Sequence, residues 1–282
     1  MLLVADAVPA LPRLWPRRRR TVLAGLLGSA LVALLVAVVG GGRVVLVDEA
    51  VYRWAPWQRW PALRPFLDWW VVLGQRAVCL AVAAVWLGLR AWRERDLRPL
   101  LLLLLATLLT NVAVGALKTA VGRLGPLQLG AGAALPGAGD VFAAGGTIFP
   151  SGHTANAVVT WGLLAVLARR WRRTAAVLAT VLAVSVGLTT VYLGTHWLSD
   201  VLAGWCAGGL VLLAVPPSAR WCRDAGARLG RAARPPGPRR ATVPRGAPVR
   251  RIRRIRLPGR VRYSASGRRE HGGPPIGRTR TR

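Results

Sequence analysis

Long apolar runs are the feature that most constrains how this 282-residue chain can fold. A helix needs roughly 20 mostly apolar residues to cross the hydrocarbon core of a bilayer. Runs of about that length recur along the chain, and hydrophobic residues make up 53% of it. The sequence therefore predicts a membrane protein rather than a soluble domain. We place six spans at about 21–40, 69–89, 99–117, 154–168, 174–194 and 199–216.

The distribution of basic residues predicts the orientation of these spans. With the N-terminus inside, cytoplasmic segments hold 33 of the 40 Lys and Arg residues, outer segments hold six, and Arg76 lies within a span. Without the C-terminal tail, whose length makes it weak evidence, the count is still thirteen to six. We therefore expect an all-α, polytopic membrane bundle with six transmembrane helices and both termini cytoplasmic.

Composition divides the chain into four parts. Residues 1–20 form a basic cytoplasmic N-terminus, and residues 21–98 hold the first two spans with a Trp-rich outer segment at 43–68. The third part, 99–216, contains the remaining four spans. Residues 217–282 form an Arg-, Pro- and Gly-rich tail with too few large apolar groups to fold alone. We expect this tail to be disordered and to bind anionic lipid headgroups, and we expect no nucleic-acid partner.

The conspicuous polar groups all fall at the outer ends of the predicted spans. Lys118 follows the third span, Ser151 and His153 precede the fourth, and His196 and Asp200 lie between the fifth and the sixth. The spans thus bring groups that are distant in sequence to one face of the membrane. Convergence of this kind marks a functional site better than any single residue does.

Each of these groups also has a plain structural interpretation. Ser151 can simply cap a helix, although the N–H groups of a first turn that contains Gly152 also bind anions. The His196–Asp200 spacing is typical of a capped helix start, but a carboxylate bonded to one imidazole nitrogen also makes the other a better nucleophile. The chain has three histidines, and two of them, His153 and His196, converge here, which favours catalysis.

Lys118 is the only lysine in the chain, although arginine would anchor the end of a span equally well. This exception suggests that the position specifically needs a lysine.

Two histidines and one carboxylate could also suggest a metal site. The outer face has too few acidic groups for a hard two-metal site and no close-spaced ligand motif. We therefore expect no metal and no cofactor, and we favour metal-independent phosphoryl transfer.

The segments "KTAVGRLGP" (118–126), "PSGH" (150–153) and "TTVYLGTHWLSD" (189–200) resemble the three motifs of the type-2 phosphatidic acid phosphatase family. That family belongs to a superfamily shared with vanadium haloperoxidases and glucose-6-phosphatase. The resemblance covers roughly 99–216 and implies that this part is the catalytic core. It also implies six spans in the cell membrane, an extracytoplasmic site, and a phosphorylated membrane lipid as substrate.

The resemblance implies a role for each residue of the site. His196 attacks phosphorus and forms a phosphohistidine, and Asp200 orients His196. His153 protonates the leaving oxygen and later activates water. The phosphate oxygens are bound by Lys118, Ser151 and the Gly152 backbone N–H.

The sequence departs from the family pattern at both phosphate-clamping arginines, whose positions Gly125 and Thr190 occupy. Charge-assisted bonds contribute roughly 1.5–3 kcal/mol each, so losing both without compensation costs about 10²- to 10⁴-fold in rate. Arg123, on the adjacent loop, is a candidate phosphate-binding replacement. Arg76 is a second candidate, because a charged residue inside a span suggests a function. Two other interpretations are equally compatible with its position: the side chain extends to the membrane surface, or it pairs with another group inside the protein.

Three functions remain open from the sequence. The leading one is a phosphatase of a lipid phosphate or polyprenyl diphosphate, and its rival is a weakly active or inactive relative that binds phosphorylated lipids. A transporter or scramblase-like bundle has less support, because the chain has no internal repeat and no chain of charges across the membrane. The sequence does not distinguish phosphatidate, phosphatidylglycerol phosphate and a polyprenyl diphosphate as substrates.

The predicted orientation can be tested by labelling in intact cells. Because arginine asymmetry places the site outside and the tail inside, a cysteine engineered within 130–140 should react with an impermeant thiol reagent. A cysteine within 240–250 should not react. The reverse pattern would contradict the predicted topology.

Overall fold

The computed structural model describes residues 16–129, 142, 145–168 and 170–232. These ranges contain no strand, and one isolated bridge joins Arg123 to Phe142. The all-α prediction is therefore confirmed for this part of the chain. The helical elements are α1 (Arg17–Val39), α2 (Arg43–Arg53), α3 (Pro56–Arg59), η1 (Pro61–Leu63), α4 (Arg64–Trp70), η2 (Val71–Gly74), α5 (Arg76–Glu94), α6 (Arg98–Val121), η3 (Pro126–Leu129), α7 (Gly152–Leu167), α8 (Arg172–Tyr192) and α9 (Leu198–Ala232).

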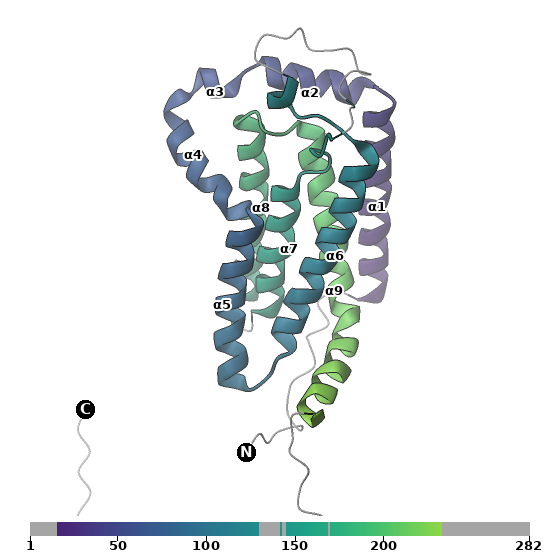
Figure 1. Cartoon of the computed structure of the whole chain (residues 1–282), viewed down its shortest axis with the longest axis vertical. Helices are drawn as coiled ribbons and strands as arrows, with labels where there is room; N and C mark the ends of the chain where they lie inside the picture. The colour runs from purple at the N-terminus through teal and green to yellow at the C-terminus, as the bar shows by residue number, and fades with distance from the viewer. Residues whose placement is uncertain (1–15, 130–141, 143–144, 169, 233–282) are drawn as a thin grey trace, which may run out of the picture. The chain divides into compact units, whose positions relative to one another are not determined.

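Six long helices, α1 and α5 to α9, lie side by side (Figure 1). Helix α7 packs against α5, α6, α8 and α9, so it lies inside the bundle. Its residues Val159, Leu163 and Leu167 share a buried apolar cluster with Leu87 of α5 and Leu102 of α6. Because successive helices run in opposite directions, α6 and α8 end where α7 and α9 begin. Helix α2 lies at that same end of the bundle (Figure 1).

Two glycines of α9 allow this helix to approach α7 closely. A Cβ on Gly204 would lie 2.8 Å from the Ser151 carbonyl oxygen, and one on Gly208 would lie 3.0 Å from the Ala155 carbonyl oxygen. Small residues four apart are a common way to bring membrane helices into close contact. The contact at Gly204 fixes the start of α7 against α9 where the predicted site lies.

Most of the predicted spans coincide with long apolar helices. By length and composition, α1, α6, α8 and the Leu198–Val215 part of α9 can cross a membrane. The pair Pro61–Gly74 and Arg76–Glu94, bent by 60°, makes a fifth candidate if it is one span. Helix α7 has 16 residues and is shorter than a standard span. The described residues therefore support a multi-pass membrane protein, while the count of six and the location of the termini stay predictions.

The second predicted span differs from the observed helix. We expected one helix over 69–89, but the chain breaks at Gln75, whose φ of −65° and ψ of 135° are extended. A Cβ on Gly74 would lie 2.5 Å from Val186 Cγ1 and 2.9 Å from the His153 carbonyl oxygen. The backbone at position 74 therefore passes so close to α7 and α8 that a residue with a side chain would not fit there. Arg76 consequently begins α5 instead of lying within a helix.

The C-terminal tail also begins later than its composition suggested. We expected disorder from residue 217, but α9 continues to Ala232. Residues 217–232 contain four Ala and four Arg, which have high helix propensity. The remainder of the tail lies outside the described residues, as does most of the Gly- and Ala-rich connection before α7.

Candidate active site

Ser151 joins the start of α7 to α9. It is the N-cap of α7, and its Oγ accepts hydrogen bonds from Thr154 Oγ1 at 2.9 Å and from the Thr154 N–H at 3.4 Å. The Ser151 N–H donates to the Asp200 carbonyl oxygen at 2.9 Å. The next N–H groups, of Gly152 and His153, belong to the first turn of the helix and have no intrahelical acceptor. This turn therefore presents the positive end of a helix dipole and backbone donors suited to an anion.

His196 is held by a tight turn after α8. Gly194 adopts a φ of +68°, which lets the chain reverse, and the Thr190 carbonyl oxygen accepts the His196 N–H at 3.3 Å. The His196 side chain is 8% exposed. Its Nδ1 lies 3.6 Å from Asp200 Oδ2 and has no hydrogen-bond partner among the described residues. Catalytic hydrogen bonds are often this long without substrate, so a small shift would complete the predicted pair.

The two histidines face each other. The ring centroids of His153 and His196 are 6.3 Å apart, and the ring planes are inclined by 66°. Because Nδ1 of His196 faces Asp200, Nε2 is the ring nitrogen left for chemistry. The two rings are close enough for a nucleophile and an acid–base residue to act on the same group.

Lys118 lies over the start of α7. A Cβ on Gly152 would be 3.7 Å from Lys118 Cε, and Lys118 Nζ donates a hydrogen bond to the Thr147 carbonyl oxygen. The structure therefore brings Lys118 and the first turn of α7 together, as the sequence predicts for a phosphate site.

Arg123 has a different set of partners from those expected of a phosphate clamp. Gly122, with a φ of +63°, ends α6 and turns the chain so that Arg123 enters the bundle, where it is 1% exposed. Its NH1 donates to Asp200 Oδ1 at 2.6 Å and to Ser199 Oγ at 2.7 Å. Its NH2 donates to Asp48 Oδ2 at 2.7 Å. These contacts direct the guanidinium toward protein carboxylates, while phosphate binding by Arg123 stays a prediction.

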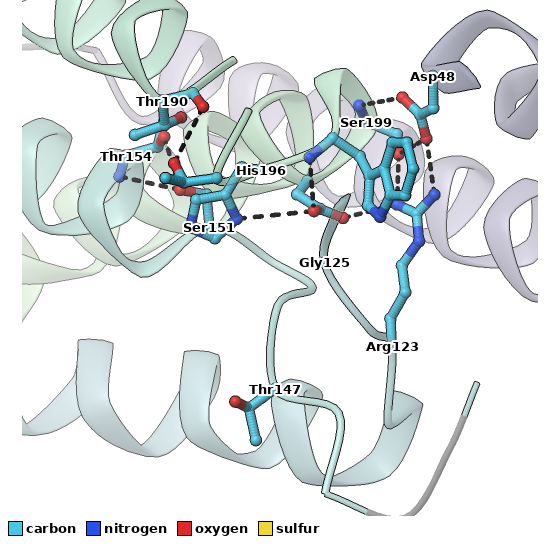
Figure 2. A network of polar contacts seen from close by, with 12 residues as sticks. Asp48, Arg123, Gly125, Thr147, Ser151, Thr154, Thr190, His196 and Ser199 are labelled. Atoms are coloured by element: carbon cyan, nitrogen blue, oxygen red, sulfur yellow. Dashed lines mark hydrogen bonds and ion pairs between the residues drawn. The ribbon is translucent and has the colours of Figure 1, made fainter. Parts of the chain in front are cut away.

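Asp48 is a member of this cluster that the sequence reasoning missed. It lies on α2, is 2% exposed, and also accepts the Ser199 N–H at 2.8 Å and the Ser199 hydroxyl at 2.5 Å (Figure 2). Burial raises the pKa of its carboxyl, while Arg123 and Ser199 act to lower it. One signal existed in the sequence: Asp48 follows buried Val45 by three positions, so it interrupts the apolar face of a short helix.

The positions of the two missing clamp arginines are filled by packed residues. A Cβ on Gly125 would lie 2.9 Å from Ile148 Cγ1. Thr190 is 1% exposed, and its hydroxyl donates to the Gly187 carbonyl oxygen at 2.7 Å. An arginine at either position would require the surrounding side chains to repack.

Arg76 lies next to the segment that packs against the start of α7. It is exposed at the first turn of α5, directly after the Gly74 segment that packs against His153. In the described part of the chain, no group of three or more His, Cys, Asp or Glu side chains is placed to bind a metal ion.

Comparison with known proteins accounts for this arrangement. Residues 99–224 match the family model of the PAP2 superfamily. This region is a PAP2 domain. The fold is similar to that in the "Crystal structure of the first transmembrane PAP2 type phosphatidylglycerolphosphate phosphatase from Bacillus subtilis", with a TM-score of 0.59 and 24% identity. The similarity covers 70% of this chain and 96% of that one. Among curated proteins, none matches the sequence.

These findings confirm the family resemblance over the predicted core. The PAP2 domain begins at residue 99 and contains every motif residue from Lys118 to Asp200. Asp48 and Arg76 lie before it, in the part of the chain that the family model does not match.

Proposed function

We propose that this protein is an integral-membrane phosphatase that hydrolyses a lipid phosphate or polyprenyl diphosphate through a phosphohistidine, without a metal. The observation that carries the proposal is the position of His196. Its Nδ1 faces Asp200 at 3.6 Å, and its ring faces His153 across 6.3 Å. This arrangement supports a nucleophile with an orienting carboxylate on one side and an acid–base group on the other.

In the first step, the lone pair of His196 Nε2 attacks phosphorus while the bond from phosphorus to the leaving oxygen breaks. Protonated His153 gives its proton to that oxygen, so the lipid leaves as a neutral alcohol or, from a diphosphate, as a monophosphate. The His196 ring becomes cationic when the N–P bond forms. The adjacent Asp200 carboxylate stabilises that charge.

In the second step, neutral His153 takes a proton from water, and the resulting hydroxide attacks the phosphohistidine. The N–P bond breaks, its electron pair returns to His196, and inorganic phosphate is released. The proton that His153 took from water leaves it protonated, and His196 is neutral again, so the starting state is restored. The two steps need no electron transfer.

The charge on the phosphoryl oxygens requires nearby cations and donors. Lys118 lies over the first turn of α7, and the backbone N–H groups of Gly152 and His153 belong to that turn. The Ser151 hydroxyl accepts two hydrogen bonds from Thr154 and retains its own proton for donation. Arg76 supplies the second positive charge that Gly125 and Thr190 do not provide.

A phosphorylated membrane lipid is the proposed substrate. The site lies at one end of a bundle whose helices are apolar enough to span a membrane. The structural neighbour from Bacillus subtilis is a phosphatidylglycerolphosphate phosphatase, which makes phosphatidylglycerol phosphate one member of the substrate panel, beside phosphatidate and a polyprenyl diphosphate. We place the site on the extracytoplasmic face, as the arginine asymmetry predicts.

A second function is favoured by one specific observation. Both clamp positions lack arginine, and Arg123 is paired with two carboxylates. A site with fewer cations can retain phosphate affinity and lose turnover, because catalysis needs extra stabilisation of the transition state. A weakly active or inactive protein that binds phosphorylated lipids is therefore the alternative.

The chemistry predicts metal-independent turnover that depends on His196. Purified protein should release phosphate from a member of the lipid panel in the presence of EDTA. His196→Ala should abolish the release, and Asp200→Asn should lower it by about 10²-fold or more, since the orienting carboxylate is lost. Activity that requires a divalent cation or survives His196→Ala would contradict the mechanism. Lipid-phosphate binding with no turnover would favour the alternative function.

Arg76 provides a separate test of how the phosphate charge is balanced. Arg76→Gln should lower kcat/KM by at least about tenfold, the scale of one lost charge-assisted bond. Arg64→Gln is the matched control, because Arg64 is also an exposed arginine at the start of a helix, and its partner is Asp68 at 3.9 Å. Equal kcat/KM values for the wild type and both variants would exclude Arg76 from the site.

A further inference from the structure

The buried polar cluster beside His196 contains two carboxylates and one guanidinium. Asp48, Arg123 and Asp200 are each no more than 2% exposed. Arg123 bridges the two carboxylates through different nitrogens, NH2 to Asp48 and NH1 to Asp200. Ser199 lies between them, with its Oγ accepting from Arg123 and donating to Asp48 (Figure 2). The phosphatase steps described above use only Asp200 of this cluster.

The contacts of Asp200 explain why the rest of the cluster matters. Its Oδ1 accepts the Arg123 bond at 2.6 Å, and its Oδ2 accepts the Trp197 N–H at 3.0 Å. Oδ2 is also the oxygen that lies 3.6 Å from His196 Nδ1. With both oxygens held, the carboxylate cannot rotate away from the imidazole. The Arg123 bond therefore fixes the orientation of the group that orients the nucleophile.

Arg123 itself needs a second partner to hold this position. Its Cζ lies 5.4 Å from the Trp197 ring centroid, and its NH2 is bound by Asp48. Without Asp48, the guanidinium would lose its NH2 partner and would be free to turn away from Asp200. With Asp48, both ends of the guanidinium are held, one by each carboxylate. The Asp200 carboxylate is thereby kept where it can stabilise His196 when that ring becomes cationic during phosphoryl transfer.

Helix α2 is held firmly enough against the site to perform this role. The rings of Tyr52 on α2 and Trp197 are 5.7 Å apart, and a Cβ on Gly194 would lie 3.4 Å from both Tyr52 and Trp57. The Tyr192 hydroxyl donates to the Trp60 carbonyl oxygen at 2.6 Å. The segment from α2 to Trp60 therefore covers the turn that carries His196.

We propose that Asp48 is a positioning residue for phosphoryl transfer, which acts on Asp200 through Arg123 and Ser199. In this proposal, the role of Arg123 is to hold the Asp200 carboxylate in its orientation. The proposal rests on the proposed phosphatase function. It assigns a part in the reaction to a helix that precedes the PAP2 domain. It also accounts for the burial of Arg123 between two carboxylates beside the site.

The first test compares Asp48→Asn with Glu49→Gln in the full-length protein. Glu49 is the adjacent carboxylate on α2, and its partner is Arg53 at 3.1 Å, away from the cluster. Asp48→Asn should lower kcat by at least about tenfold while KM changes by less than about twofold, because the phosphate-binding groups are untouched. Glu49→Gln should leave both constants within about twofold of the wild type.

A double-mutant cycle separates positioning from a merely structural role. If Asp48 acts through Asp200, Asp48→Asn should lower kcat by less than about twofold further in an Asp200→Asn background. A structural role would instead lower thermal stability and leave kcat per folded molecule unchanged, or would give effects that multiply. Ser199→Ala is the second variant if Asp48→Asn does not fold. Ser199→Ala removes one hydroxyl that connects Arg123 to Asp48, and it removes no charge. It should therefore lower kcat by less than Asp48→Asn does, and its effect should also be non-additive with that of Asp200→Asn.

The reactivity of His196 gives a readout that needs no turnover. Diethyl pyrocarbonate labels imidazole nitrogens, and mass spectrometry can follow His196 with His153 as the reference in the same molecule. Asp48→Asn should slow labelling of His196 relative to His153, as Asp200→Asn should, whereas Glu49→Gln should not. If the wild type turns over no lipid phosphate, the proposed function fails and this ratio alone decides the role of Asp48.

Two results would overturn the positioning role. One is a kcat for Asp48→Asn equal to that of the wild type, in a protein whose turnover is lost in His196→Ala. That outcome would leave the proposed function intact. The other is a ratio of His196 to His153 labelling that is the same in Asp48→Asn and the wild type.

Discussion

Arg123 carries a positive charge into the interior of the protein, where it and both of its carboxylate partners are almost completely shielded from solvent. Removing an ion from water costs several kcal/mol even after relaxation, so such a group is stable only when its partners are placed with good geometry. Arg123 meets this condition by joining three separate parts of the chain: α2 through Asp48, the end of α6 through its own backbone, and α9 through Asp200. The arrangement of the site depends on this contact.

The other features of the site follow from how the helices end near this cluster. Gly204 lets α9 approach the start of α7, and the Ser151 N–H binds the Asp200 carbonyl oxygen there. That contact sets the distance between the two helix starts that carry His153 and Asp200. The first turn of α7 offers backbone donors for an anion, and Lys118 lies over it. We propose that an anion site and the nucleophile lie together at this end of the bundle.

Much of this could be predicted from the sequence because it depends on local patterns. The spacing of His196 and Asp200 places both at one helix start, and apolar length alone located most of the helices. The break at Gln75 was missed because its cause is the tertiary packing of Gly74 against α7 and α8, which hydropathy does not encode. The partners of Arg123 were missed for a similar reason. Asp48 is 75 residues away in sequence, and nothing in either local segment indicates the pairing.

The central claim is that His196 accepts the phosphoryl group, and the most direct test is to isolate that adduct. The protein would be mixed with a lipid phosphate labelled in its phosphoryl group, quenched in alkali within a fraction of a turnover, and digested. Phosphohistidine survives alkali and is lost in acid. The account predicts an acid-labile phosphate on the peptide that contains His196, and none on that peptide from His196→Ala. Label on His153 or on Ser151, or turnover with no covalent label at all, would contradict it.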